Sequence, residues 1–161
     1  MASEISGKAK RVFDVNVLAI FLVKNHPGNK YVSSVVEDGL RGAYFPVVMD
    51  FLPMRAYWIM TKRWGCSEEE SAEAVVHFVK AYDRPRYIGL GRETVLESFR
   101  LAKELKHDVF DCVYLAFALQ EKAQGIVTTD TDFERLCEKV GLEYVNPVPR
   151  EVLQRFKVGN R

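Results

Sequence analysis

The sequence predicts an α/β protein, a three-layer α/β/α sandwich built on a short, mostly parallel sheet. Two observations carry this prediction. Short apolar runs that suit buried strands alternate along the chain with longer segments of helical periodicity. Turn-forming residues separate these segments, and no repeat or low-complexity linker divides the chain. We therefore expect a single domain over residues 11–161, preceded by a flexible polar leader at residues 1–10.

Each expected strand is a short apolar run bounded by turn residues or by helix signals. The first of them, RVFD, ends on an aspartate, and the fourth leads directly into the segment TTDTDF. The strands are expected at residues 11–14, 44–48, 86–90, 126–128 and 142–145.

Caps and breakers mark where the helices begin and end. Ser67 followed by Glu70 forms a capping box, and Asp50 and Asp108 are expected N-caps. Gly125 is expected to break the helix before it. The helices are expected at residues 16–24, 31–40, 50–63, 67–82, 92–107, 109–122 and 133–140, with a C-terminal one ending near residue 156.

The composition excludes several classes of protein. The net charge of the 161 residues is +1, so any phosphate-binding surface has to be local. No apolar run reaches about 18 residues, and no membrane span is therefore expected. The three cysteines, Cys66, Cys112 and Cys137, lack the spacing of a zinc site. Reduced thiols in the cytoplasm are expected.

Three aspartates lie where a charge is unfavourable. Asp14 lies in VFDVNVLAIFLV, Asp111 is the one charge in VFDCVYLAFAL, and Asp130 follows an apolar strand and two threonines. An ionised carboxylate beside a core needs a partner or a metal. Asp14 and Asp130 follow predicted parallel strands, and Asp111 lies in the first turn of a helix that begins at the same sheet edge.

The three carboxylates are therefore expected to converge to about 4–6 Å from one another and to bind Mg²⁺ or Mn²⁺, hard cations that prefer oxygen ligands. Without a metal, crowding of like charges is expected to raise at least one of their pKa values.

Ordinary structural roles are alternatives for the same residues. Asp111 fits a helix capping box, and Asn16 fits a helix N-cap. Asp130 and Asp132 fit a turn, with Asp132 as the next N-cap. Asp14 can instead pair with a buried lysine or arginine. Spacing alone leaves these alternatives open.

Three blocks of sequence together resemble the PIN-domain family, and in size and layout its VapC-like ribonucleases of toxin–antitoxin pairs. The blocks are VFDVNVL, HDVFDCVYLAFAL and GIVTTDTDFERL, and the resemblance extends over about residues 11–146. It implies roles for the following residues: Asp14, Asp111 and Asp130 as catalytic metal ligands, Asp132 as a further ligand, and Asn16 and Thr128 as groups that orient water or a phosphate oxygen.

One position departs from the family pattern. The family's second acidic residue is a glutamate in the first turns of the helix after the second strand, and here that position falls on Pro53. Asp50 lies three residues earlier and shares a helix face with it, so Asp50 is a candidate substitute ligand. It equally fits an N-cap.

The resemblance implies a metal-dependent endoribonuclease that cleaves single-stranded RNA, with an antitoxin protein as a possible partner. The alternative is a catalytically reduced PIN domain that binds nucleic acid or protein, and the sequence does not distinguish RNA from DNA as the target. A flavodoxin-like phosphate-binding protein is disfavoured because no Gly-rich loop follows the first strand. The basic residues available to steer RNA are Lys24, Lys30, Arg55, Lys62 and Arg63.

A homodimer is expected through the helices at residues 31–40 and 49–60. The second helix carries more apolar side chains than one core-facing stripe needs. The alternative is that neighbouring helices cover both of its faces.

Overall fold

The structure, a computed structural model, describes the backbone of residues 7–158 and the side chains of residues 7–156. Within these residues, five strands form one sheet in the order β3–β2–β1–β4–β5, and every pairing is parallel. The mostly parallel sheet that the sequence predicts is therefore confirmed. The strands are β1 (Lys10–Phe13), β2 (Phe45–Met49), β3 (Arg86–Ile88), β4 (Gly125–Val127) and β5 (Glu143–Val145).

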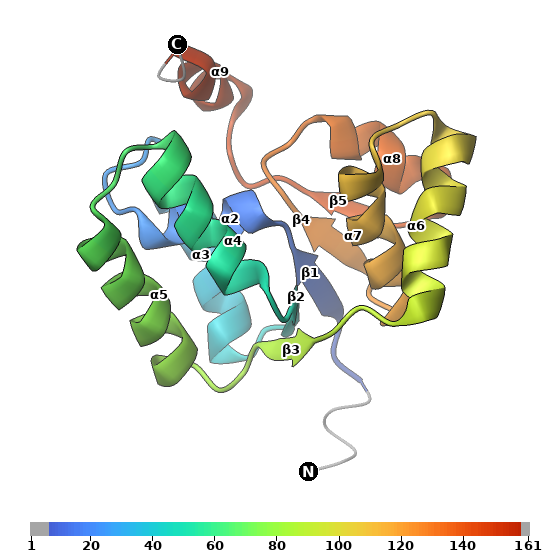
Figure 1. The fold of residues 1–161 in the computed structure, drawn as a ribbon, viewed down its shortest axis with the longest axis horizontal. Coiled ribbons are helices and arrows are strands. Elements are labelled where there is room, and N and C mark those ends of the chain that lie inside the picture. Colours follow the sequence, from blue (N-terminus) through green and yellow to red (C-terminus); the bar gives the residue numbers. More distant parts are fainter. Residues whose placement is uncertain (1–6, 159–161) are drawn as a thin grey trace.

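Helices cover both faces of the sheet. Figure 1 shows α2 to α5 on one side and α6, α7 and α8 on the other, which confirms the three-layer sandwich. The helices are α2 (Val15–Leu22), α3 (Asn29–Arg41), α4 (Leu52–Trp58), its π-helical continuation η1 (Ile59–Arg63), α5 (Glu68–Ala81), α6 (Arg92–Leu105), α7 (Val109–Gln120), α8 (Asp132–Val140) and α9 (Arg150–Val158).

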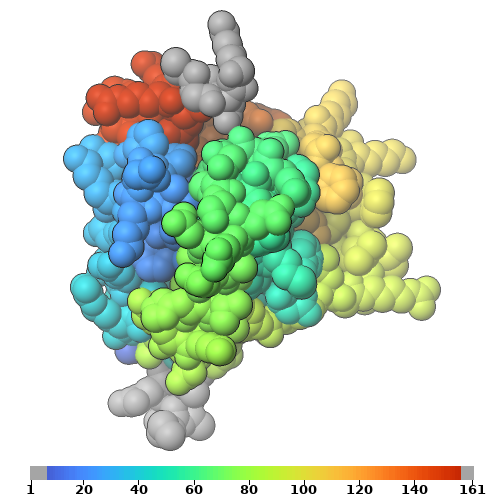
Figure 2. Space-filling model, turned by 60° about the vertical axis from the view of Figure 1, so that its left-hand side comes forward, coloured from blue at the N-terminus to red at the C-terminus, as the bar shows by residue number. Residues whose placement is uncertain are grey.

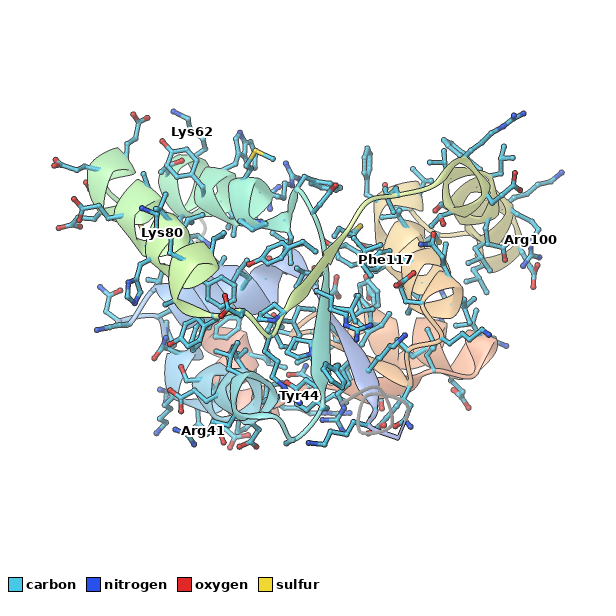
Figure 3. All side chains as sticks on the ribbon, turned by 90° about the horizontal axis from the view of Figure 1, so that it is seen from below. Arg41, Tyr44, Lys62, Lys80, Arg100 and Phe117 are labelled. Atoms are coloured by element: carbon cyan, nitrogen blue, oxygen red, sulfur yellow. The ribbon has the colours of Figure 1, made fainter. Side chains whose placement is uncertain are left out.

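The hydrophobic core lies between the sheet and these two helical layers. Val12 and Phe13 of β1 and Ile126 and Val127 of β4 are fully buried. Central strands covered on both faces are apolar throughout, which is why these strands are apolar runs in the sequence. The Phe117 side chain, also fully buried, extends from α7 toward the sheet (Figure 3).

The order of the strands creates a point of divergence at the centre of the sheet. β1 is the central strand, β2 and β3 lie on one side of it, and β4 and β5 lie on the other. The connections on the two sides place their helices on opposite faces (Figure 1). In open parallel sheets, a crevice forms at the carboxyl ends of the two strands whose connections lead to opposite faces of the sheet. Ligands bind in this crevice.

Two predicted N-caps are confirmed. The Ser67 hydroxyl accepts a hydrogen bond of 3.3 Å from the amide of Glu70 at the start of α5. The Asp108 carboxylate accepts one of 2.7 Å from the amide of Phe110 at the start of α7. These side chains satisfy amides that have no partner within the helix.

Two predicted boundaries are wrong. Asp50 is not an N-cap, because Phe51 holds that position and no side chain caps α4. The Asp50 amide instead donates to the carbonyl of Ile88, so it extends the pairing of β2 with β3. Gly125 does not end the helix before it, because α7 ends at Gln120 and Gly125 is the first residue of β4. A Cβ atom at Gly125 would stand 2.5 Å from the carbonyl oxygen of Glu143, so β5 approaches where only glycine fits.

The first strand begins within the predicted leader. β1 begins at Lys10, the last residue of the predicted leader, and residues 1–6 of that leader lie outside the described residues. No helix in the described part of the chain is long and apolar enough to cross a membrane. All three cysteines are free.

Candidate active site

Asp14 lies at the carboxyl end of β1, at the point where the sheet diverges. Its amide donates to the carbonyl of Val127 in β4, and its carboxylate is 4% exposed. The Thr128 hydroxyl donates a hydrogen bond of 2.7 Å to Asp14 Oδ2. No salt bridge between described residues includes Asp14. The expected alternative, a buried lysine or arginine as its partner, is therefore wrong.

The turn after β4 continues the same hydrogen-bonded network. The Asp130 amide donates to Thr128 Oγ1 at 3.0 Å, and the Asp132 amide donates to Asp130 Oδ1 at 2.9 Å. Asp130 therefore forms a turn, as one alternative predicted. Asp132 is not the N-cap, because Thr131 holds that position and Asp132 begins α8. The turn engages one Asp130 oxygen and leaves the other for a ligand.

The first turn of α7 contributes Asp111, and the connection before this helix contributes an unexpected histidine, His107. Asp111 does not complete a capping box, because its Oδ2 is hydrogen-bonded at 2.7 Å to Nε2 of His107. Lys106 ends α6 in the left-handed region, with φ of 52°, and this reverses the chain between the two helices. One ligand atom each from His107, Asp111 and Asp132 lie within 4.8 Å of one another.

Burial and crowding raise the pKa of two of these carboxylates, Asp14 and Asp130. Burial raises the pKa of Asp14 to about 6, the Thr128 hydrogen bond opposes that shift, and the charges of Asp130 and Asp111 add to it. Burial also raises the pKa of Asp130, together with the charges of Asp132 and Asp111. The expected upward shift is therefore confirmed, but burial contributes more to it than crowding does. We call Asp14, Asp111, Asp130 and Asp132 the carboxylate cluster.

Asp50 lies apart from the carboxylate cluster. It is exposed, and its Oδ2 lies 3.2 Å from where a Cβ atom on Gly89 would stand, so it faces the end of β3. Its charge is not among the causes of the shifted pKa of Asp14 or Asp130. Pro53 is buried near the start of α4, and neither α4 nor η1 contains an acidic residue.

One basic residue of α4, Arg55, lies near the cluster, whereas Lys62 of η1 does not. Burial and the charge of Asp14 raise the pKa of Tyr114 well above its usual value, and Arg55 of α4 acts in the opposite direction. Arg55 therefore lies on the side of the cluster where the family has an acid. Lys62 points away from the protein (Figure 3) and forms a salt bridge of 3.1 Å with Glu68.

A cleft of about 810 Å³ opens beside the cluster. Asn16 and Asp130 lie in its lining together with Arg63, Trp64 and residues of α9. Asn16 is not an N-cap, because Asp14 occupies that position before α2. Its side chain therefore faces the cleft as the second residue of the helix. We call this hollow the α9 cleft.

Sequence reasoning missed His107 and the α9 cleft. The spacing of His107 and Asp111, four residues apart, is a signal that the predicted break between two helices concealed. The cleft has no local signal, because its walls come from segments far apart in the sequence.

Comparisons with known proteins support one family. The PIN-domain profile matches residues 11–139. VapBC2 from Rickettsia felis, bound to a DNA fragment of its promoter, is 15% identical with a TM-score of 0.63, over 85% of this chain and 98% of the other. VapC20 from Mycobacterium tuberculosis, a sarcin–ricin loop cleaving toxin, is 10% identical with a TM-score of 0.64, over 78% and 93%. A toxin–antitoxin complex from Klebsiella pneumoniae is 19% identical with a TM-score of 0.58, over 86% and 98%.

No curated protein matches the sequence. At these identities the three solved structures establish a shared fold. The profile match adds the sequence relationship, because it spans most of the chain and includes Asp14, Asp111 and Asp130. The resemblance that the three sequence blocks indicate is thus confirmed, and the chain belongs to the PIN-domain family.

Proposed function

We propose that this protein is a cytoplasmic, metal-dependent endoribonuclease that cleaves single-stranded RNA at the carboxylate cluster. One observation carries the proposal: Asp14 is a buried carboxylate with no cationic partner among the described residues, and other carboxylates surround it. Such an arrangement is unfavourable unless a cation binds. The family, and the description of VapC20 as a sarcin–ricin loop cleaving toxin, support RNA as the substrate. The free cysteines support a reducing compartment.

The donor atoms of the cluster fit a divalent ion. Asp111 and Asp132 supply carboxylate oxygens of the kind that Mg²⁺ and Mn²⁺ prefer, and the imidazole nitrogen of His107 lies within 4.8 Å of them. Asp14 and Asp130 are not part of this closest group, but their carboxylates lie near enough for the charges of Asp130 and Asp111 to raise the pKa of Asp14. A divalent ion bound there would polarise the phosphodiester and lower the pKa of a water molecule.

The surrounding residues position the ligands and the substrate. Thr128 donates its one proton to Asp14 and accepts a hydrogen bond from the Asp130 amide, and the residue is fully buried. We therefore assign Thr128 a positioning role rather than the contact with substrate that the family resemblance implies. Asn16 lines the cleft and is the residue that orients a phosphate oxygen or water.

A catalytically reduced PIN domain is the second candidate. The observation that favours it is the absence of an acidic residue from α4 and η1, together with the position of Asp50 toward Gly89. A cluster with fewer ligands binds a cation more weakly and holds it in a less defined geometry.

The test is cleavage of a single-stranded RNA, with a DNA strand of the same sequence alongside, in Mg²⁺, in Mn²⁺ and in EDTA. We expect metal-dependent cleavage of RNA by the wild type and its loss in Asp111→Asn, which keeps the side-chain shape and removes the charge. The fold of that variant is expected to persist, by circular dichroism. A wild type that cleaves under neither ion would favour the second candidate.

We further propose an antitoxin partner and a homodimer. Two of the similar structures include an antitoxin or carry the VapBC name, which supports the partner. Phe51, Met54 and Trp58 are exposed around α4, an apolar surface that supports self-association. The other expected helix, α3, exposes polar side chains instead, namely Lys30, Ser34, Asp38 and Arg41. We expect light scattering to give a dimer that Met54→Glu dissociates, and a monomeric wild type would contradict the homodimer.

A further inference from the structure

We propose that the α9 cleft binds the unpaired nucleotides that flank the scissile phosphodiester, and that α9 supplies the cations that hold their phosphates. The proposal rests on the proposed ribonuclease function and adds a substrate subsite to it. The cleft volume of about 810 Å³ falls within the range of about 300–1,000 Å³ typical of pockets for small ligands. Asn16 and Asp130 belong to its lining, so a strand in the cleft runs directly onto the carboxylate cluster.

The α9 helix lies over the carboxyl edge of the sheet and outside the span that the family profile matches. Figure 1 shows it at the top of the view, above α4 and the loop that follows α2, and Figure 2 shows it packed against the segment that follows α2. The profile match ends at residue 139, whereas α9 begins at Arg150. The family match therefore does not extend to the α9 wall of the subsite.

The charges in the cleft favour a polyanion. Three arginines line it: Arg63 from the end of η1 and Arg150 and Arg155 from α9. Within the described part of the chain none of them forms a salt bridge. Two acidic residues, Asp130 and Glu134, share the lining, and a cation at the cluster would offset the first of them. The cleft is thus the local cationic surface that a chain with a net charge of +1 needs to hold RNA.

An aromatic group forms one wall of the cleft. The His26 ring lies 4.8 Å from the ring of Trp64 and 4.6 Å from that of Phe156 in α9. A Cβ atom on Gly28 would stand 2.6 Å from the Phe156 ring, so α9 docks where a glycine makes room for it. Aromatic rings beside arginines are the combination on which single-stranded nucleic acids stack their bases.

The π-helical turn shapes the part of the cleft wall that carries Trp64. π-turns are rare and are frequent at functional sites. Here η1 continues α4 through Arg63, and the next residue is Trp64, so a cation and a ring project into the cleft in succession. The walls come from α2, η1, α9, the turn after α2 and the turn after β4. A paired duplex keeps its bases stacked and cannot offer one to these rings.

The first test measures RNA binding without catalysis. A labelled single strand of roughly eight nucleotides is titrated in EDTA and followed by anisotropy between about 50 and 200 mM salt. We expect Arg150→Gln/Arg155→Gln to weaken binding at least about tenfold. We also expect it to reduce the slope of log affinity against log salt concentration by about 1.4, because each phosphate contact to a single strand contributes about 0.7.

The matched control is Arg41→Gln/Lys80→Gln. It removes the same charge at the ends of α3 and α5, which lead into the amino edge of the sheet (Figure 3). We expect this control to retain the wild-type slope, and thermal melts to show that both double variants fold. Equal losses in the two double variants would overturn the proposal, because net charge and not the cleft would then hold the RNA.

The second test uses fluorescence. The chain has two tryptophans, so Trp58→Phe leaves Trp64 as the reporter. We expect RNA to quench Trp64, and the quenching to diminish with the Arg150 and Arg155 substitutions. If the arginine variant binds RNA as well as the wild type does, and RNA does not quench Trp64, the subsite proposal is wrong, and a protein segment becomes the alternative occupant of the cleft. Metal-dependent cleavage by the wild type would still support the proposed function in that case. Failure of the wild type both to bind and to cleave RNA would instead overturn the function and the subsite together.

Discussion

Asp14 and Asp50 occupy equivalent positions at the ends of adjacent strands, yet their surroundings differ completely. Each directly follows an apolar strand, β1 or β2. Asp14 is 4% exposed and accepts a hydrogen bond from Thr128 at the end of β4. Asp50 is exposed and faces Gly89 at the end of β3, which presents no side chain to it.

The difference shows that strand order, and not position within a strand, decides which aspartate joins a site. β1 and β4 border the point where the sheet diverges, and helices close over both sides of it. β2 and β3 share one face and one direction of connection, so no crevice forms between their ends. A carboxylate is buried among others at the first place and hydrated at the second.

The largest expected difference is in catalysis. Asp14→Asn removes a charge from the cluster, so we expect metal-dependent RNA cleavage to fall by more than about 100-fold, which corresponds to a few kcal/mol of lost charge stabilisation. Asp50→Asn is expected to stay within about twofold of the wild type. Initial rates at saturating metal measure both. Similar losses in the two variants would show that Asp50 acts at the site after all.

A second contrast concerns stability without metal. The pKa of Asp14 is raised to about 6 from 3.8, so ionisation of this carboxyl group destabilises the folded state. The destabilisation is absent below pH 3.8, the pKa in the unfolded chain, and is fully present above about pH 6. The shift corresponds to an upper limit of about 3 kcal/mol at neutral pH. We therefore expect Asp14→Asn to raise the free energy of unfolding by up to this amount at neutral pH, and to leave it unchanged below about pH 4.

Urea denaturation in EDTA at the two pH values measures this gain. Asp50→Asn is the control, and we expect no comparable gain from an exposed side chain. A gain in Asp14→Asn that does not change with pH would mean that packing, and not the buried charge, is responsible.

The sequence predicted the cluster residues because an aspartate inside an apolar run is conspicuous. It did not separate Asp14 from Asp50, since both follow such a run and only the strand order distinguishes them. His107 was not predicted because its place beside Asp111 depends on the left-handed conformation of Lys106. The conformation of a single residue leaves no periodic pattern in the sequence. The α9 helix was predicted, but its contact with His26 joins residues about 130 positions apart, which no local pattern records.

A smaller effect is expected for His107, which has no counterpart at Asp50. An imidazole nitrogen suits Mn²⁺ better than Mg²⁺. We therefore expect His107→Gln to weaken Mn²⁺ binding by about tenfold, and Mg²⁺ binding by less. Calorimetric dissociation constants for the two ions provide the measurement. An equal loss for both ions would restrict His107 to holding Asp111 in place.

The smallest expected effect separates capping from metal binding within one helix. Asp108 caps α7 three residues before Asp111. We expect Asp108→Ala to lower the free energy of unfolding by about 1 kcal/mol and to leave the metal affinity unchanged. Thermal denaturation and metal titration of the same sample check this. A large loss of metal affinity would place Asp108 in the cluster.

The most direct test of the account is calorimetric titration of Mn²⁺ into the metal-free protein near pH 6, in two buffers of different ionisation enthalpy. Because the pKa of Asp14 is about 6, part of the protein holds a proton there that a cation must displace. We predict saturable binding with release of a proton fraction in the wild type and in Asp50→Asn, and the loss of both in Asp14→Asn. A wild type that binds no Mn²⁺, or Asp50→Asn and Asp14→Asn variants that lose binding equally, would contradict the claim that the cluster at the divergence of the sheet is a cation site.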